Sequence, residues 1–141
     1  MRLDDLRQAT TVFRLAIELT EKSELSEAFR LFPSGACGDA SLLLAAFLHE
    51  EGFGNFALVS GSYGNCDHAW LERDGIVIDI TADQFCGFES AVHIGPSDWH
   101  EHFGPPRYHG LADLYLWQFA DAKALLRDYT MLKSRAQLAQ C

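Results

Sequence analysis

Cys37, His68 and Asp79 are the residues of this 141-residue chain whose types and order are suited to nucleophilic chemistry. Cys37 precedes an apolar run, His68 lies in a His-Ala-Trp segment, and Asp79 lies in an Ile-Asp-Ile-Thr segment. A thiol that attacks a carbonyl needs a base to take its proton and a third group to orient that base. The order therefore predicts an activated cysteine, with His68 as its general base and Asp79 as the orienting acid.

The segment 33–50 is predicted to be a helix that carries Cys37 in its first turn. Ser34 is a suitable N-cap, and Asp39 follows the cysteine in the same turn. Unpaired amides and the positive end of the helix dipole favour a thiolate there, whereas the carboxylate of Asp39 opposes it, so a cationic partner is needed. Apolar residues recur at helical spacing at Ala40, Leu43, Leu44, Phe47 and Leu48.

Asp74-Gly75 is predicted to be a two-residue turn between antiparallel strands, and this turn sets the register of the hairpin. In that register Trp70 lies opposite Asp79. His68 is then the diagonal neighbour of Asp79, roughly 7 Å away between backbone positions, a gap that the two side chains can close to a hydrogen bond. One additional residue in the turn would move the acid to the opposite face.

Side chains alternate along both predicted strands, which divides them into two faces. One face is apolar and is predicted to join the core: Ala69, Leu71, Ile76, Ile78 and Ile80. The other face carries His68, Trp70, Glu72, Val77, Asp79 and Thr81.

The other elements complete an expected α+β chain with an antiparallel sheet. Residues 82–110 are aromatic, contain several histidines and lack a clear period, which favours a functional loop or lid. The remaining predictions are helices near 3–20, 23–31 and 111–138 and strands near 56–60, 67–73 and 76–81, with the polar segment 61–65 as a link.

Composition predicts one domain over residues 1–141, because 48% hydrophobic residues can form a core and no linker or repeat interrupts the chain. The formal charge of −9 argues against nucleic acid or an anionic membrane as partner. No signal peptide or membrane span is recognisable, and four cysteines without a Cys-x-x-Cys pair favour free thiols. We therefore expect a cytoplasmic protein without a disulfide between Cys66 and Cys86.

The ordered motifs resemble the transglutaminase-like branch of the papain-like cysteine enzymes. They are Gly-Ala-Cys-Gly-Asp-Ala-Ser at a helix start, His68-Ala69-Trp70 and Asp79-Ile80-Thr81, and the resemblance covers about residues 30–86. It implies a catalytic helix packed on a small antiparallel sheet with flanking N- and C-terminal helices. It also implies Cys37 as nucleophile, His68 as base and Asp79 as orienting acid.

The chain departs from the papain pattern at the oxyanion donor, because the segment 29–32 before the cysteine contains no glutamine. The backbone amide of Cys37 and the side chain of Gln84 are candidate donors in its place. Trp70 and Tyr63 are candidates for the substrate cleft, with core packing an equal alternative for Trp70. The calcium sites of animal transglutaminases have no counterpart, and we expect neither metal nor cofactor.

The expected function is thiol-dependent hydrolysis of a peptide or isopeptide amide in a peptide or protein substrate. Protein crosslinking and glutamine deamidation could use the same thioester chemistry, and a non-catalytic peptide-binding domain could keep the same fold. A zinc site is a further alternative, although its spacing matches no known zinc pattern and exposed histidines on a lid are favoured. The candidate ligands are His100 and His102 with His93, His109 or Cys86.

Overall fold

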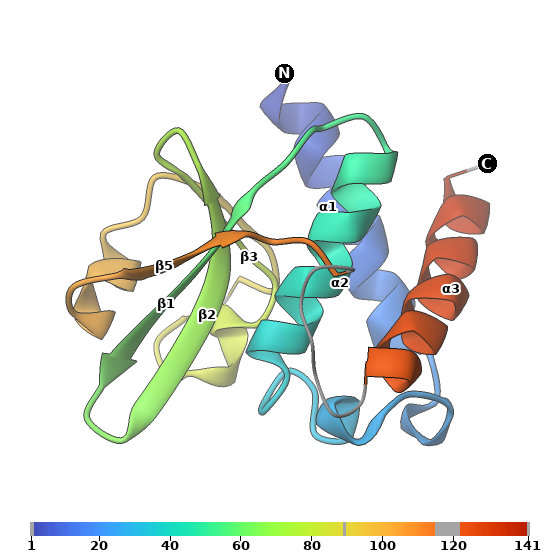
Figure 1. The fold of residues 1–141 in the computed structure, drawn as a ribbon, viewed down its shortest axis with the longest axis horizontal. Coiled ribbons are helices and arrows are strands. Elements are labelled where there is room, and N and C mark those ends of the chain that lie inside the picture. The colour runs from blue at the N-terminus through green and yellow to red at the C-terminus, as the bar shows by residue number, and fades with distance from the viewer. Residues whose placement is uncertain (1, 89, 115–121, 141) are drawn as a thin grey trace.

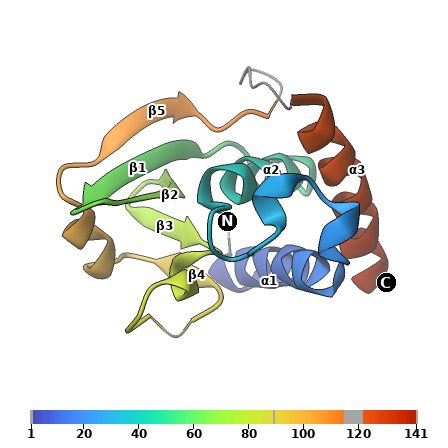
Figure 2. The same cartoon turned by 90° about the horizontal axis from the view of Figure 1, so that it is seen from below.

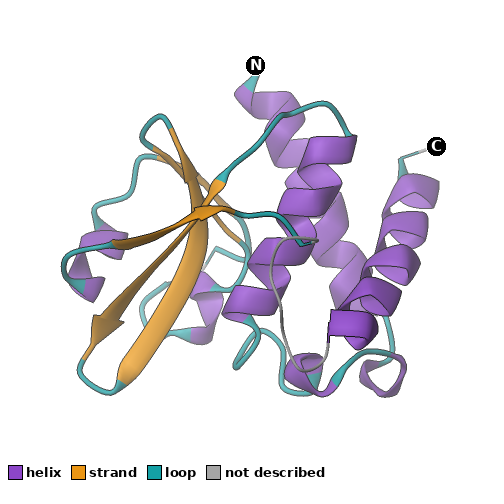
Figure 3. Ribbon diagram, viewed as in Figure 1, coloured by secondary structure: helices purple, strands orange, loops and turns teal. Residues whose placement is uncertain are grey.

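The computed structural model describes residues 2–88, 90–114 and 122–140, and it has an α+β architecture (Figure 1, Figure 3). None of the helices in these ranges has the combination of length and apolar composition that a membrane span requires. The α-helices are α1 (Leu3–Leu19), α2 (Cys37–Glu50) and α3 (Ala122–Ala139). The strands are β1 (Ala57–Tyr63), β2 (Cys66–Arg73), β3 (Ile76–Asp79), β4 (His93–Gly95) and β5 (Arg107–Leu111). Short 3-10 helices are η1 (Lys22–Glu24), η2 (Glu27–Phe29), η3 (Ala82–Gln84) and η4 (Trp99–Phe103).

The strands form one antiparallel sheet in the order β4-β3-β2-β1-β5. Helix α2 lies between this sheet and the helices α1 and α3, which cover the side of α2 away from the strands (Figure 1, Figure 2). Phe47 of α2 stacks on Phe13 of α1 with 5.0 Å between ring centroids. Leu71 and Ile78 extend the same core from the sheet, so α2 is packed on both of its sides.

The Asp74-Gly75 turn has the predicted length, because Arg73 pairs with Ile76 across it. Both turn residues have positive φ, +52° and +79°, as the mirror-image hairpin turns require. The predicted register is therefore confirmed. The predicted apolar face also joins the core between sheet and helices, with Leu71, Ile78 and Ile80 buried and Ala69 and Ile76 packed against them.

The hairpin of β1 and β2 differs from the prediction. The sequence predicts that its first strand ends near Ser60 and that residues 61–65 form a linking loop. Strand β1 continues to Tyr63, and Tyr63 pairs with Cys66 around a Gly64-Asn65 turn. Gly61, which suggested a loop in the sequence, is a strand residue where Phe103 packs closely on the backbone. A glycine is therefore required here by the close contact with Phe103, and the local sequence pattern gives no sign of that contact.

Two predictions around the start of α2 are wrong. Residues 23–31 fall in η1, in η2, in the short link between them and in the turn that follows η2, not in an α-helix. The N-cap of α2 is Ala36, not Ser34, and no side chain caps the helix. Gly35 has a φ of +76°, which no α-helix contains, so the helix begins only after it, with Cys37 as its first residue.

The predicted lid at residues 82–110 is also wrong, because this stretch contributes β4 and β5, the two edge strands of the sheet, and the helices η3 and η4. Such short strands have no recognisable period, and their partners are distant in sequence. The predicted final helix from Leu111 is wrong at its start, since Leu111 ends β5. Residues 115–121 lie outside the described residues, and α3 begins at Ala122.

A buried arginine ties α1 to the chain that follows β3. Arg14 makes two hydrogen bonds to the Asp83 carboxylate, at 2.9 and 2.8 Å, and it is 6% exposed. It also donates to the carbonyl oxygens of Ile80 and Ala91. Because this fork-shaped group satisfies several acceptors at once, it holds the segment after Asp79 in place.

Gly61→Ala is expected to destabilise the protein by about 1–3 kcal/mol, because the added methyl group overpacks the contact with η4. A Cβ at this position would lie 2.5 Å from the carbonyl oxygen of Phe103 and 2.7 Å from its Cβ. Urea unfolding measures the effect. Gly38→Ala is the matched control, since its Cβ would meet nothing within 4 Å and it lies in a helix, where alanine is favoured. Equal stability of Gly61→Ala and the wild type would contradict the prediction.

Candidate active site

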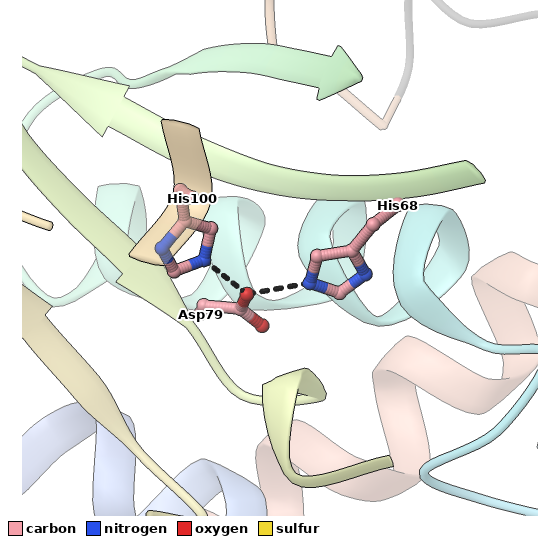
Figure 4. Close-up of side chains that lie close together, drawn as sticks. All are labelled: His68, Asp79 and His100. Carbon is pink, nitrogen blue, oxygen red and sulfur yellow. Dashed lines mark hydrogen bonds and ion pairs between the residues drawn. The ribbon is translucent and has the colours of Figure 1, made fainter. Parts of the chain in front are cut away.

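The structure brings His68 and Asp79 together. Nε2 of His68 donates to Oδ2 of Asp79 at 2.6 Å, and both residues are 1% exposed (Figure 4). The two residues come from neighbouring strands, β2 and β3, on the face opposite the helical core. The contact was predicted from turn length and alternation alone, and the geometry agrees with that deduction.

The Asp79 carboxylate accepts further hydrogen bonds. Its Oδ1 accepts the backbone N–H of Thr81 at 2.9 Å, and the Thr81 hydroxyl lies 3.4 Å from the same oxygen. Its Oδ2 accepts a second imidazole N–H, from Nε2 of His100, at 2.6 Å (Figure 4). Burial alone would raise the pKa of Asp79, but the hydrogen bonds and charges of His100 and His68 hold it well below its usual range. The acid is therefore a buried, fully bonded carboxylate.

His100 is the site residue that the sequence interpretation misplaced. It was predicted to lie on an exposed lid, but the structure places it in η4 with 4% exposure and a ring directed at Asp79 (Figure 4). Its Nδ1 lies 2.5 Å from the hydroxyl oxygen of Ser97. No local pattern links residues this far apart on the chain, because the contact depends on how η4 packs across the sheet.

Cys37 is half-buried and begins α2. Strand β3 pairs with β2 only over Leu71–Arg73, so the first part of β2 pairs with β1 alone among the described strands. This opening lets the start of α2 approach His68. Burial would lower the pKa of His68, but interaction with Asp79 and with the Cys37 thiol raises it to about 9.

The second ring nitrogen of His68, Nδ1, differs from Nε2 in its surroundings. Nδ1 is buried and makes no hydrogen bond within the described part of the chain, and it points away from Asp79 (Figure 4). The Cys37 thiol interacts with the His68 ring, but its approach to Nδ1 stops short of hydrogen-bond geometry. Nδ1 is therefore the atom available to exchange a proton with the thiol.

Aromatic rings enclose His68. Phe85, Phe103, Trp70 and Trp99 have ring centroids 5.0, 5.3, 5.6 and 6.2 Å from that of His68. Trp70 is 2% exposed and packs on both histidines, which makes it a packing residue of the site. These rings exclude water, so the electrostatic interaction between imidazole and carboxylate is strengthened.

The other two predicted site residues lie farther from the chemistry. Tyr63 is 67% exposed. It lines a cleft of about 350 Å³ together with Cys66, Phe85, Cys86, Trp99, His102 and Phe103. The amide of Gln84 donates to the Thr81 carbonyl at 3.0 Å, so the structure does not direct it at the thiol.

The structure gives the histidines among the predicted zinc ligands other partners. The rings of His93, His102 and His109 bond instead to the Gly95 carbonyl, the Trp99 carbonyl and the Ser60 hydroxyl, and Cys66 and Cys86 are free thiols. Across residues 2–88, 90–114 and 122–140, His68, Asp79 and His100 form the one group with metal-ligand spacing. Their 2.6 Å contacts fit N–H groups donated to one oxygen, whereas ligands of one tetrahedral zinc stand about 3.4 Å apart.

A scan against protein-family models, a search of curated proteins and a search of solved structures each found no match to the chain. The functional argument therefore rests on the chemistry and positions of the side chains described above.

The free energy of unfolding is expected to fall by up to about 3 kcal/mol between pH 6.5 and 9. The pKa of His68 rises from 6.5 to about 9 on folding, so its contribution is complete below pH 6.5 and is lost as the pH approaches 9. Urea unfolding at several pH values measures this, with His68→Gln as the comparison. The same pH slope in both proteins would contradict the prediction.

Proposed function

We propose that this protein is a thiol-dependent acyl-transfer enzyme that hydrolyses a peptide or isopeptide amide. The observation that carries the proposal is the asymmetric bonding of His68. Its Nε2 is held by a buried carboxylate, while its buried Nδ1 has no partner in the described residues and the Cys37 thiol is near. A buried structural histidine normally satisfies both nitrogens, so an unsatisfied one favours a reacting group.

The reaction begins with the proton of Cys37 on Nδ1 of His68. The sulfur attacks the carbonyl carbon and forms a C–S bond, and the carbonyl electron pair moves to oxygen. His68 then gives the proton to the leaving nitrogen as the C–N bond breaks, which releases an amine and leaves a thioester. Asp79 keeps the imidazole oriented throughout, because it binds the nitrogen that does not react.

Water completes the cycle. Nδ1 of His68 takes a proton from a water molecule while the oxygen of that water attacks the thioester carbon. The C–S bond then breaks, which releases the acid and restores the thiolate of Cys37. A primary amine in place of water would give crosslinking, and attack on a glutamine side chain would release ammonia and give deamidation. These outcomes share the same three residues and differ only in donor and acceptor.

The start of α2 supplies an oxyanion donor in this proposal. The first N–H groups of a helix have no partner within the helix, and Cys37 is the first residue of α2. Its own amide is therefore available for the negative oxygen that forms when the thiol attacks. The positive end of the helix dipole acts in the same direction.

We also propose that this α+β chain has the transglutaminase-like form of the papain-like fold. Its support is the arrangement of the three residues, with the thiol at the start of the helix packed on the sheet and the base and acid on adjacent antiparallel strands. The cleft beside Tyr63 is the proposed substrate cleft, because three of its lining rings, Phe85, Trp99 and Phe103, also contact His68. Its aromatic lining suits an apolar side chain of a peptide.

Intact-mass analysis after exposure to limiting iodoacetamide tests the proposal. We expect Cys37 to be alkylated first at pH 6, ahead of the exposed Cys66 and Cys86, and at least tenfold more slowly in His68→Ala. His109→Ala is the matched control, since His109 is exposed and bonds to Ser60. Equal alkylation of the four thiols, or a rate at Cys37 that does not depend on His68, would count against the proposal.

A further inference from the structure

We propose that His100 is a positioning residue, which fixes the Asp79 carboxylate and through it the orientation of His68. This inference rests on the proposed function, since it assigns a role within the same site. The juxtaposition that carries it is a hydrogen-bonded series in which the Ser97 hydroxyl bonds His100, His100 bonds Asp79, and Asp79 bonds His68 (Figure 4).

Both histidines bond to the same carboxylate oxygen. Nε2 of His68 and Nε2 of His100 each lie 2.6 Å from Oδ2 of Asp79. Because an ionised carboxylate only accepts hydrogen bonds, both nitrogens must carry protons. One oxygen therefore sets the tautomer of the base and of the second histidine together.

The Nδ1 nitrogens distinguish the role of His100 from that of His68. Nδ1 of His100 is paired with the Ser97 hydroxyl at 2.5 Å, whereas Nδ1 of His68 has no partner within the described residues. The Ser97 oxygen also accepts the backbone N–H of His100 at 3.3 Å, so its own proton is free to point at Nδ1. His100 has no nitrogen left to accept a proton from the thiol, and His68 has one.

His100 is held rigidly enough to position the acid. Its ring packs against Trp70 and Trp99, with centroids 4.8 and 4.9 Å away. Helix η4, which carries it, packs on β1 where Gly61 leaves room for the backbone of Phe103.

The carboxylate is consequently fixed from three directions, by two imidazoles on Oδ2 and by the Thr81 amide on Oδ1. With His68 as the only donor to Oδ2, the carboxylate could follow that ring when the ring gains or loses a proton. The second imidazole prevents this, and the acid stays where the base needs it.

The test compares His100→Gln with His100→Leu in a chain whose other three cysteines, Cys66, Cys86 and Cys141, are replaced by serine. Glutamine keeps an N–H donor for Asp79, and leucine removes it. The rate of Cys37 alkylation by iodoacetamide at pH 6 is expected to fall at least tenfold in His100→Leu and less than threefold in His100→Gln. Hydrogen exchange of the His68 Nε2 proton, followed by NMR with 15N-labelled histidine, is expected to accelerate at least tenfold in His100→Leu.

Ser97→Ala provides a second variant if His100→Leu does not fold. It removes the partner of Nδ1 and leaves the His100 ring and its bond to Asp79 in place, so we expect NMR to show faster hydrogen exchange of the His100 Nε2 proton and alkylation to slow about threefold. Thermal unfolding checks that each variant used is folded.

Unchanged alkylation and exchange in folded His100→Leu or Ser97→Ala would overturn the inference. The proposed function would still stand if His68→Ala slows the alkylation of Cys37. Equal alkylation rates of Cys37 in the wild type and in His68→Ala would instead contradict the function itself. Stoichiometric zinc in the wild type that disappears in His100→Leu would also overturn the inference, because a metal would replace both Nε2 protons.

Discussion

A Cys37→Ala variant is expected to lose turnover by at least about 10⁴-fold, because no other group in the site can form the thioester. The fold should survive, since the residue is half-buried at the start of a helix and alanine is well accepted there. We expect the free energy of unfolding to change by less than about 1 kcal/mol. A loss of activity with retained stability would assign the chemistry to the sulfur.

Turnover can be measured without knowing the natural substrate. A pool of casein peptides serves as donor, and new amino groups, free ammonia and incorporation of a labelled amine report hydrolysis, deamidation and crosslinking separately. Cys86→Ala is the matched control because this thiol is exposed in the neighbouring cleft. Turnover that persists in Cys37→Ala would contradict the proposal, and peptide binding by an inactive wild type would identify a non-catalytic binding domain.

The second large effect is expected at Asp79. Asp79→Ala removes the acceptor for two buried imidazoles and for the Thr81 amide, so the free energy of unfolding should fall by about 3–5 kcal/mol. Asp79→Asn keeps the shape but removes the charge that stabilises the imidazolium of His68, and its NH2 group must face either the two imidazole N–H donors or the Thr81 amide. Turnover should therefore fall roughly 10⁴-fold, with a smaller loss of stability than in Asp79→Ala.

Urea unfolding and the peptide-pool assay together check this pair of variants. Asp98→Asn is the control, since Asp98 is an exposed acid beside η4 whose side chain caps nothing. The contrast between alanine and asparagine is the informative part, because it separates lost stability from lost orientation. Wild-type activity in a folded Asp79→Asn protein would remove the acid from the mechanism.

The sequence was sufficient to predict the His68–Asp79 contact, because a two-residue turn and strand alternation are local properties. Given Asp74-Gly75, Trp70 and Asp79 must lie across from one another, and the observed pairing of Arg73 with Ile76 confirms that register. The α+β class and the helix after Cys37 could be predicted for the same reason, since each depends on the spacing of apolar residues within one segment.

His100 and Arg14 could not be predicted in the same way. His100 reaches Asp79 because η4 packs across the sheet, and that packing depends on a glycine in β1, far away in sequence. Arg14 is spaced like any helix residue, and nothing nearby indicates that it is buried against Asp83. Contacts between distant segments follow from the assembled fold, which no local periodicity encodes.

The contacts of Arg14 also show how small a working version of this protein could be. Arg14 fixes the Ile80 carbonyl and Asp83, on the stretch that also carries the Thr81 amide bound to Asp79. A miniature assembled from only the cysteine helix and the hairpin would contain all three proposed catalytic side chains and still lack this anchor. Transplanting the proposed chemistry into a new scaffold therefore calls for the opening helix as well, although no residue of that helix lines the proposed substrate cleft.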